Sequence, residues 1–370
     1  MVTYRRIRVV SRNSAFVPVY YRNESFFIVA ITVVRLVNFL EGKMPIKVND
    51  NLSAIGQLQE EGIFTMTEER ANNQRVRPLK ICVLNLMPLK KPTEIQLLRL
   101  LGNSPLQIEV DFCRTVSRET THTDNTYLDN AYLEFEDIKD KYYDAFLMTG
   151  APVEKYAFED VDYWQEIVTY LDWAELHCYS TMCLCWGAQA ALYHYYGVNK
   201  KILPAKMFGV FQYGLTVKNH PLLRGFDDRY FIPQSRHTAV DDDAIDSCKS
   251  LQVLSRSVEN GINICATKDL RRIFVLGHFE YDRYTLADEY YRDKKKGLPI
   301  DIPRHYFPEG DTTQEPVFKW RSYAHLFYMN WLNIVYQDTP YDLHELTSAA
   351  GNKLEKALNE YNRILQQLQQ

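Results

Sequence analysis

The sequence predicts an α/β protein built on a doubly wound, mostly parallel sheet with flanking helices and a smaller antiparallel region. Three observations indicate this fold. Residues Leu79–Leu86 form a nearly continuous apolar run, which is typical of a strand buried on both faces. Apolar runs and segments with helical spacing then alternate along the chain. Within Cys178–Gly197 an apolar run leads directly into a segment of helical spacing.

The first half of the chain is organised as β-α-β units. After Leu79–Leu86 we expect a helix from Thr93 that ends at Gly102. Two strands and a helix are then expected before Cys178–Gly197, over residues 106–116, 144–149 and 160–176. Repeated units of this kind produce a parallel sheet, because each helix carries the chain back across the sheet.

The second half contains weaker strands, which suit an antiparallel edge or a subdomain because they are shorter and alternate polar with apolar residues. They cover residues 202–217, 229–233, 251–257 and 262–267. A last apolar run at 273–276 ends in Gly277-His278-Phe279-Glu280. An aromatic-rich helix over residues 320–336 is expected to pack on the sheet.

The chain ends differ from the domain at 44–345. Residues 1–43 carry an apolar run, Phe26–Val37, which Arg35 interrupts. A signal peptide and a membrane span are alternatives, but the run lies late for the first and is short and charged for the second. We favour an extension outside the fold, upstream of a natural start at Met44. The helical tail, 346–370, has an apolar stripe that fits an oligomer contact or a solvated helix.

Composition narrows the possible functions. The net charge of −4 gives no basic bias that would indicate nucleic-acid binding. The 7 cysteines are odd in number and lack the paired spacing of a zinc site, so we expect free thiols in a reducing compartment and no bound metal.

Cys185 lies where the strand within Cys178–Gly197 turns into the helix. A cysteine at such a turn is exposed to substrate and lies close to the positive end of the helix dipole, which favours a nucleophilic thiolate. Gly187 leaves room for a tight turn. Position 183 is Cys183, where a nucleophile elbow of the G-x-nucleophile-x-G type carries glycine. The alternative is a cysteine buried as a small apolar residue.

His278 and Glu280 follow the last predicted parallel strand and are candidates for a base and the group that orients it. Residues two apart in extended backbone point to the same side, so the carboxylate can face the imidazole. Gly150-Ala151 and Lys90 also follow predicted strands, and one crevice at the carboxyl edge of the sheet would collect them with Cys185. A histidine satisfied within a turn is the alternative.

These residues and several longer motifs resemble the homoserine O-acyltransferase family of methionine biosynthesis, in its glutamine-amidotransferase-like group. The resemblance extends from Met44 to about Leu343 through RPLKICVLNLMPLKKPTEIQLLRLL, FEDIKDKYYDAFLMTGAPVE, STMCLCWGAQAAL, GHFEYDRYTL and DIPRHYFP. It implies a class I glutamine-amidotransferase-like fold, a catalytic acyltransferase domain at 44–345, a cytoplasmic location and a homodimer.

The resemblance also implies roles for individual residues. Cys185 matches the family's acyl-thioester nucleophile, His278 its general base and Glu280 the residue that orients the base. One departure is Phe279, where the family often has proline. Further matches are a lysine near the nucleophile, Lys90, and three positions that bind the amino-acid substrate: Lys206, Ser235 and Arg292.

The chemistry of these residue types agrees with ping-pong acyl transfer from a thioester to the hydroxyl of L-homoserine. Backbone N–H groups near Trp186 and Gly150 are candidates to stabilise the oxyanion. The carboxylate of homoserine suits a planar cation, which Arg292 or Arg236 could supply, although a surface salt bridge is the alternative for either arginine.

The acyl donor is argued from Glu154. The resemblance implies glycine here in succinyl-transferring members and glutamate in acetyl-transferring ones. A carboxylate at this point would repel the terminal carboxylate of a succinyl group and fill the space of a longer chain. We therefore expect acetyl-CoA as co-substrate, with no other cofactor, no metal and no membrane or nucleic-acid partner. The alternatives are a homoserine O-succinyltransferase, a cysteine-dependent amidotransferase or hydrolase, and a non-catalytic binding protein.

Overall fold

The computed structural model divides into two units, Met1–Met44 and Pro45–Gln370. In the first unit, β1 (Arg5–Val10) and β2 (Phe16–Tyr21) form an antiparallel two-stranded sheet. The structure describes residues 5–10, 16–21, 46–48, 52–60, 65–66, 77–117 and 124–347. The apolar run at Phe26–Val37 and the part of the predicted helical tail beyond residue 347 lie outside these ranges, so the expectations for both chain ends remain predictions.

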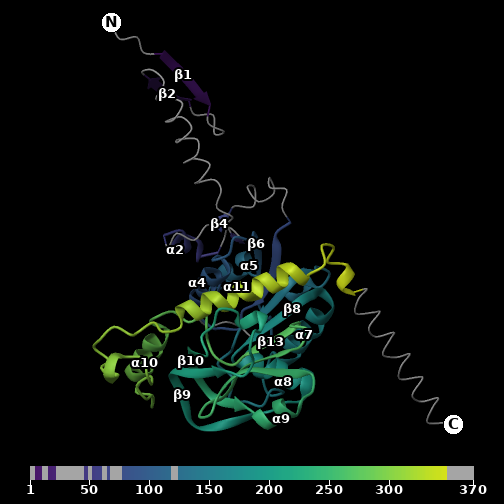
Figure 1. Ribbon diagram of the computed structural model, residues 1–370, viewed down its shortest axis with the longest axis vertical. Helices are drawn as coiled ribbons and strands as arrows, with labels where there is room; N and C mark the ends of the chain where they lie inside the picture. Colours follow the sequence, from purple (N-terminus) through teal and green to yellow (C-terminus); the bar gives the residue numbers. More distant parts are fainter. Residues whose placement is uncertain are drawn as a thin grey trace, which may run out of the picture. The chain divides into compact units, whose positions relative to one another are not determined.

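The described strands of the second unit form one 11-stranded sheet in the order β10-β9-β11-β12-β13-β8-β7-β5-β6-β3-β4 (Figure 1). Its parallel part comprises β13 (Arg272–Val275), β8 (Cys178–Leu184), β7 (Tyr143–Met148), β5 (Leu79–Leu84), β6 (Ile108–Cys113), β3 (Ile46–Val48) and β4 (Thr65–Met66). The predicted α/β class is confirmed.

The antiparallel strands extend the same sheet as an edge. They are β12 (Gly261–Thr267), β11 (Leu251–Ser257), β9 (Lys200–Leu215) and β10 (Arg229–Val240). We expected the strand that begins at Arg229 to end at Pro233. β10 is the last described strand in the sheet order, where proline is tolerated, and it continues to Val240.

Helices cover both faces of the parallel strands, and β5 illustrates the consequence for its sequence. Ile81 and Val83 pack in the hydrophobic cluster that contains α4 (Lys90–Leu101) and α11 (Arg321–Asp338). Cys82 and Leu84 pack in the cluster that contains α7 (Trp164–His177) and α8 (Trp186–Tyr196). Because successive side chains point to opposite faces, a strand covered on both sides is apolar along its buried part, and in β5 Lys80 is the exposed exception.

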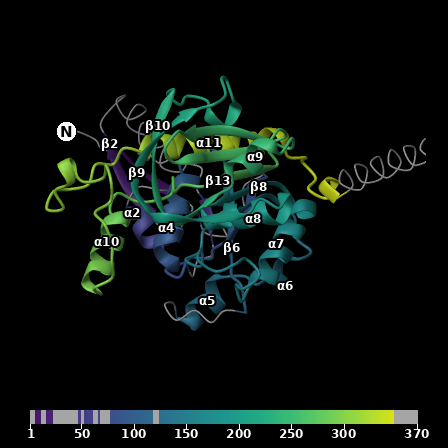
Figure 2. The ribbon, with the colours of Figure 1, turned by 90° about the horizontal axis from the view of Figure 1, so that it is seen from below.

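The remaining helices are short, and α10 carries residues of the site described below. They are α2 (Ile55–Glu60), α5 (Asn125–Ala131), α6 (Phe135–Ile138), α9 (Asp242–Ser247) and α10 (Thr285–Lys295), with 3₁₀ turns at Pro221–Leu223 and Pro308–Gly310. Figure 2 shows β10 and α9 on one side of the view and α5 and α6 on the other. The predicted helix at Thr93 begins earlier, at Lys90, because Pro92 fits in the first turn of a helix.

The register of the central strands brings their carboxyl ends to one edge of the sheet. Met148 of β7 pairs with Cys183 of β8, and Val275 of β13 pairs with Leu184. The segments that follow β7, β8 and β13 therefore meet at this edge, which is where ligands bind in open α/β sheets.

Candidate active site

Cys185 forms the turn between β8 and α8. Its backbone has φ 49° and ψ −116°, a positive φ that is uncommon for a residue with a side chain. The N–H of Cys185 donates to the carbonyl oxygen of Val275 at 2.7 Å, which fixes the turn to β13. The helix begins at Trp186, so the cysteine lies at the positive end of the α8 dipole. Strain of this kind is found at functional sites.

Two glycines permit close packing around this turn. A Cβ on Gly187 would lie 2.5 Å from the carbonyl oxygen of Thr149, and one on Gly150 would lie 3.2 Å from Cβ of Cys185. Cys183, which replaces the glycine of a full elbow motif, remains a regular residue of β8 and is completely buried. The sharp turn thus begins only after Leu184 and does not need glycine at position 183.

His278 follows β13 and lies at the same sheet edge as Cys185. Its N–H donates to the carbonyl oxygen of Pro233 at 3.0 Å, and its ring stacks on Tyr281 with centroids 4.0 Å apart. Nδ1 of His278 lies 2.6 Å from Oε1 of Glu280. Nε2 has no hydrogen-bond partner among the described residues, so it is available to a reacting group.

The electrostatic surroundings of His278 favour its charged form. Burial alone lowers the pKa of the imidazole, but the interactions with Cys185 and with the Glu280 carboxylate outweigh burial and raise the pKa well above its usual value. The cysteine, histidine and glutamate thus form one interacting group, which can hold a thiolate and imidazolium pair.

A second cluster centres on Glu289 of α10, a residue that our sequence analysis did not identify. Oε1 of Glu289 accepts from Nζ of Lys206 at 2.5 Å, and Oε2 accepts from Oγ of Ser235 at 2.8 Å. The guanidinium of Arg292 lies 3.9 Å from Oε1. The three residues predicted to bind an amino acid therefore surround one carboxylate. Glu289 and Arg292 stand three residues apart in a helix, a spacing that could have revealed the pair.

Glu154 follows β7, and its Oε1 accepts from the backbone N–H of His237 at 3.0 Å. Burial raises the pKa of this carboxyl, while the His237 N–H, Lys206 and His278 act in the opposite direction. The interactions with Lys206 and His278 link Glu154 to both clusters. Glu154 therefore lies within electrostatic range of His278, and its place beside the acyl group stays a prediction.

Three further candidates, Lys90, Trp186 and Arg236, make contacts within the fold. Nζ of Lys90 donates to the carbonyl oxygen of Asn85 at 2.6 Å, and it lies 5.5 Å from the Tyr132 ring centroid. The side chain of Trp186 is completely buried and packs against Phe158 and Tyr163, and its backbone N–H is the candidate for the site.

Arg236 is 1% exposed, and its guanidinium donates to Gln234, Thr238 and Asn260. Arg236 therefore stabilises the fold, and Arg292 remains as the candidate cation for a substrate carboxylate.

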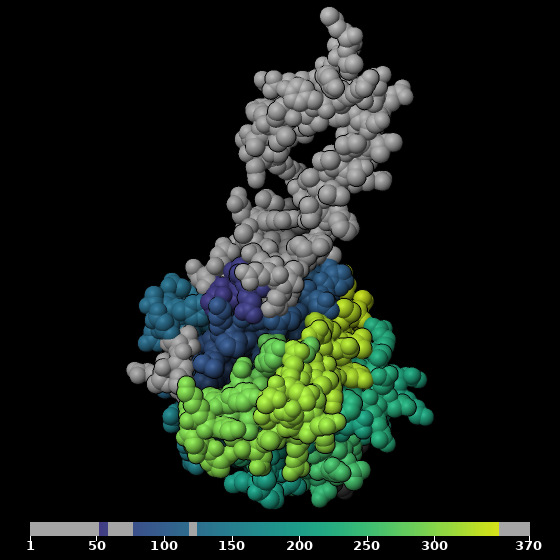
Figure 3. All heavy atoms as spheres, turned by 90° about the vertical axis from the view of Figure 1, so that its left-hand side faces the viewer, coloured from purple at the N-terminus to yellow at the C-terminus, as the bar shows by residue number. Residues whose placement is uncertain are grey.

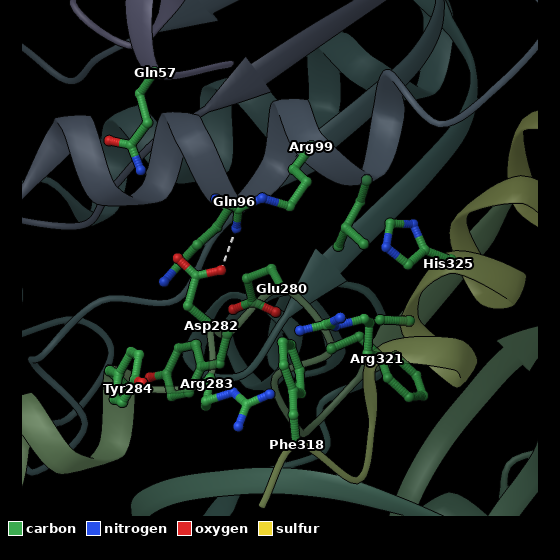
Figure 4. A pocket seen from close by; sticks show the side chains of 14 residues that line it. Gln57, Gln96, Arg99, Glu280, Asp282, Arg283, Tyr284, Phe318, Arg321 and His325 are labelled. Carbon is green, nitrogen blue, oxygen red and sulfur yellow. Dashed lines mark hydrogen bonds and ion pairs between the residues drawn. The ribbon is translucent and has the colours of Figure 1, made fainter. Parts of the chain in front are cut away.

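Glu280 also lines a cavity of about 530 Å³ (Figure 4). Its charged lining includes Arg99, which pairs with Asp282, and Arg321, whose side chain extends toward Glu280. Figure 3 shows the surface of α4 (blue) adjoining that of the segment from α10 to α11 (green to yellow). Oε2 of Glu280 has no hydrogen-bond partner among the described residues.

Within the described ranges, no group of three or more His, Cys, Asp or Glu side chains is placed to hold a metal ion. In the same part of the chain, every helix is too short or too polar to cross a membrane.

Fold and site together define an α/β protein that brings Cys185, His278 and Glu280 to one edge of its sheet. The profile of the family described as homoserine O-succinyltransferase matches residues 45–341, and the chain belongs to this homoserine acyltransferase family. Its relatives include homoserine O-acetyltransferases of three bacteria. That of Petrotoga mobilis is 50% identical over 83% of this chain and 99% of its own length. The Lactococcus lactis enzyme is 48% identical over 88% of this chain and 100% of its own length. The Agathobacter rectalis enzyme is 48% identical over 81% of this chain and 97% of its own length.

Among solved structures, a glutamine amidotransferase from Thermotoga maritima aligns with 70% of this chain and 99% of its own, at 13% identity and a TM-score of 0.49.

Proposed function

We propose that this enzyme transfers an acetyl group from acetyl-CoA to the hydroxyl of L-homoserine, giving O-acetyl-L-homoserine and CoA, through a thioester on Cys185. The observation that carries the proposal is the buried Cys185, His278 and Glu280 group with the Glu154 carboxylate beside it. The names of relatives about half identical to this chain support it.

In the first half-reaction the Cys185 thiolate attacks the thioester carbon of acetyl-CoA. The bond from that carbon to the CoA sulfur breaks, and the CoA thiolate takes the proton of the His278 imidazolium. The backbone of Gly150 and the N–H of Trp186 are the candidate surroundings of the oxyanion, because a Cβ on Gly150 would lie 3.6 Å from the nitrogen of Trp186.

In the second half-reaction homoserine occupies the place of CoA. His278 accepts the hydroxyl proton as the oxygen attacks the Cys185 thioester, and the bond to the Cys185 sulfur breaks. Glu289 suits the ammonium group of homoserine and Arg292 its carboxylate. Acetyl-CoA enters as a substrate and CoA leaves as a product, so the proposed route needs no bound cofactor or metal.

Methionine biosynthesis, a cytoplasmic location and a homodimer are parts of the same proposal. The odd number of cysteines, 7, motivates the expectation of a reducing compartment.

The donor is the point at which the family description and the relatives' names differ, and kinetics can decide it. We expect kcat/KM to favour acetyl-CoA over succinyl-CoA in the wild-type enzyme and Glu154→Gly to reduce this preference. Glu154→Gln separates charge from size, because it keeps the volume and removes the charge. A wild-type preference for succinyl-CoA, or a preference unchanged in Glu154→Gly, would contradict the assignment of the donor.

A further inference from the structure

Tyr281 directly follows Glu280 and lies face to face with His278. The centroids of the two rings are 4.0 Å apart, and their planes differ by 13°. His278 is 3% exposed and Tyr281 is 9% exposed, so the contact is largely shielded from water. One face of the imidazole is therefore covered by an aromatic side chain to which neither half-reaction assigns a role.

The tyrosine ring is itself held in place by its surroundings. The carbonyl oxygen of Tyr281 accepts from Nε1 of Trp320 at 2.8 Å. Its side chain belongs to a small hydrophobic cluster that includes Phe208 of β9, Leu286 of α10 and Trp320. A ring packed in this way has little freedom to move, so it can restrain the imidazole that stacks on it.

A single hydrogen bond does not fix the plane of the His278 imidazole. The contact of Nδ1 with Oε1 of Glu280, at 2.6 Å, holds one edge of the ring. Rotation about that edge would swing Nε2 away from the reacting group. A parallel aromatic ring in contact with the imidazole face opposes this rotation.

The stacked ring also favours the charged form of the base. The face of an aromatic ring is negative, so it stabilises a cation above it, and more strongly where water is excluded. Besides Tyr281, the ionisable side chains that interact with His278 are Cys185, Glu280 and Glu154. Burial raises the pKa of the Tyr281 hydroxyl well above its usual value, so the tyrosine stays neutral and acts through its ring face.

We propose that Tyr281 is a positioning residue, whose ring face holds the His278 imidazole in the plane that both proton transfers require and stabilises its charged form. The inference rests on the proposed acyl transfer at Cys185 and deepens it. The competing role is that of the hydroxyl, because Tyr281 also interacts with Glu289 and Arg292 at the proposed homoserine site. A hydroxyl that binds substrate and a ring that positions the base predict different kinetics.

Two substitutions separate the ring from the hydroxyl. Tyr281→Phe keeps the ring and removes the hydroxyl, whereas Tyr281→Leu removes both. Tyr142→Leu is the matched control, because Tyr142 contacts His177 with ring centroids 4.7 Å apart and lies at the amino end of β7, opposite to the site. The readouts are the single-turnover rate of Cys185 acylation by acetyl-CoA, KM for homoserine and the profile of kcat/KM against pH.

We expect Tyr281→Leu to slow acylation and the transfer to homoserine about 10-fold each, the effect of a cation–π contact shielded from water, because His278 acts in both half-reactions. Since the lost contact favours the imidazolium, the alkaline limb should move by roughly one unit to lower pH. Tyr281→Phe and Tyr142→Leu should stay close to the wild type in rate and in pH profile.

An equal loss in Tyr281→Phe and Tyr281→Leu, or a change confined to KM for homoserine, would overturn the inference and assign the role to the hydroxyl. Wild-type kinetics in Tyr281→Leu would overturn it as well.

A second measurement does not depend on folding of the leucine variant. In NMR spectra of the wild-type enzyme with isotope-labelled histidine, the ring protons of His278 should lie upfield of their usual range, because the stacked tyrosine shields them. Loss of the signals in His278→Asn assigns them, and Tyr281→Phe should preserve the shift. Ordinary chemical shifts for these protons would overturn the inference. Failure of the proposed function is distinguishable, because the wild-type enzyme would then transfer no acetyl group from acetyl-CoA to homoserine.

Discussion

Nδ1 of His278 lies 2.6 Å from Oε1 of Glu280, and both side chains are almost completely buried. The carboxylate fixes the ring so that Nε2, which has no partner among the described residues, is left for the reacting group. It also helps to raise the pKa of His278. One contact therefore accounts for both the orientation and the protonation of the base.

Glu280→Gln is predicted to lower acyl transfer roughly 100-fold to 10,000-fold, the usual range for general acid–base catalysis. Since Glu280 raises the pKa of His278, its neutralisation lowers that pKa, and the imidazolium is lost at lower pH. The alkaline limb of the profile of kcat/KM against pH should therefore move to lower pH. Glu315→Gln, in an ion pair with Arg283, is the control. An alkaline limb in the wild-type position would count against this role.

Glu289→Gln is predicted to raise KM for homoserine roughly 10-fold to 100-fold, because the amide keeps the shape but cannot neutralise Lys206 or an ammonium group. Acylation by acetyl-CoA alone should continue at close to the wild-type rate. Asp288→Asn, at the exposed neighbouring position in α10, serves as the control. Steady-state and single-turnover kinetics separate the two effects, and a slowed acylation step would place Glu289 elsewhere in the mechanism.

Gly187→Ala is predicted to destabilise the protein by about 2 kcal/mol or more, because its Cβ would meet the Thr149 carbonyl oxygen at 2.5 Å. The start of α8 must shift to relieve this clash, and Cys185 must shift with it. Gly56→Ala provides the matched comparison, since nothing lies within 4 Å of its added Cβ. Urea unfolding measures the stability. Equal stability of the two variants would show that the turn is looser than described.

Arg77→Ala is predicted to destabilise the fold by about 2 to 4 kcal/mol, because it leaves the buried Asp144 carboxylate without its ion-pair partner. Two hydrogen bonds, at 2.9 and 2.8 Å, join these side chains at the start of β7. The exposed pair of Lys139 and Glu136 is the comparison, and Lys139→Ala should leave the unfolding midpoint unchanged. Thermal and urea unfolding of both variants check this difference.

The sequence predicts the strand-turn-helix around Cys185 well because its signal is local. An apolar strand, a cysteine and a helical segment follow one another within Cys178–Gly197, and the structure has β8, Cys185 and α8 in this order. His278 and Glu280 are predictable for a similar reason, since they directly follow an apolar run that becomes β13.

The remaining contacts depend on distant parts of the chain. Glu289 is 83 residues from Lys206 and 54 from Ser235, and only the fold brings them together. The donor to Glu154 is a backbone N–H of His237, which leaves no signature in a side-chain pattern. Arg236 has a guanidinium group that could bind a carboxylate. The tertiary fold buries this group, and its N–H donors bind Gln234 and the carbonyl oxygen of Thr238.

The central claim is that Cys185 carries the acyl group, and mass spectrometry of the intact enzyme tests it most directly. The enzyme is exposed briefly to acetyl-CoA or to succinyl-CoA without homoserine. We predict a gain of one acetyl group from acetyl-CoA, absent in Cys185→Ser and lost when homoserine is added. An acetyl gain that persists in Cys185→Ser, or one that homoserine does not remove, would contradict the account.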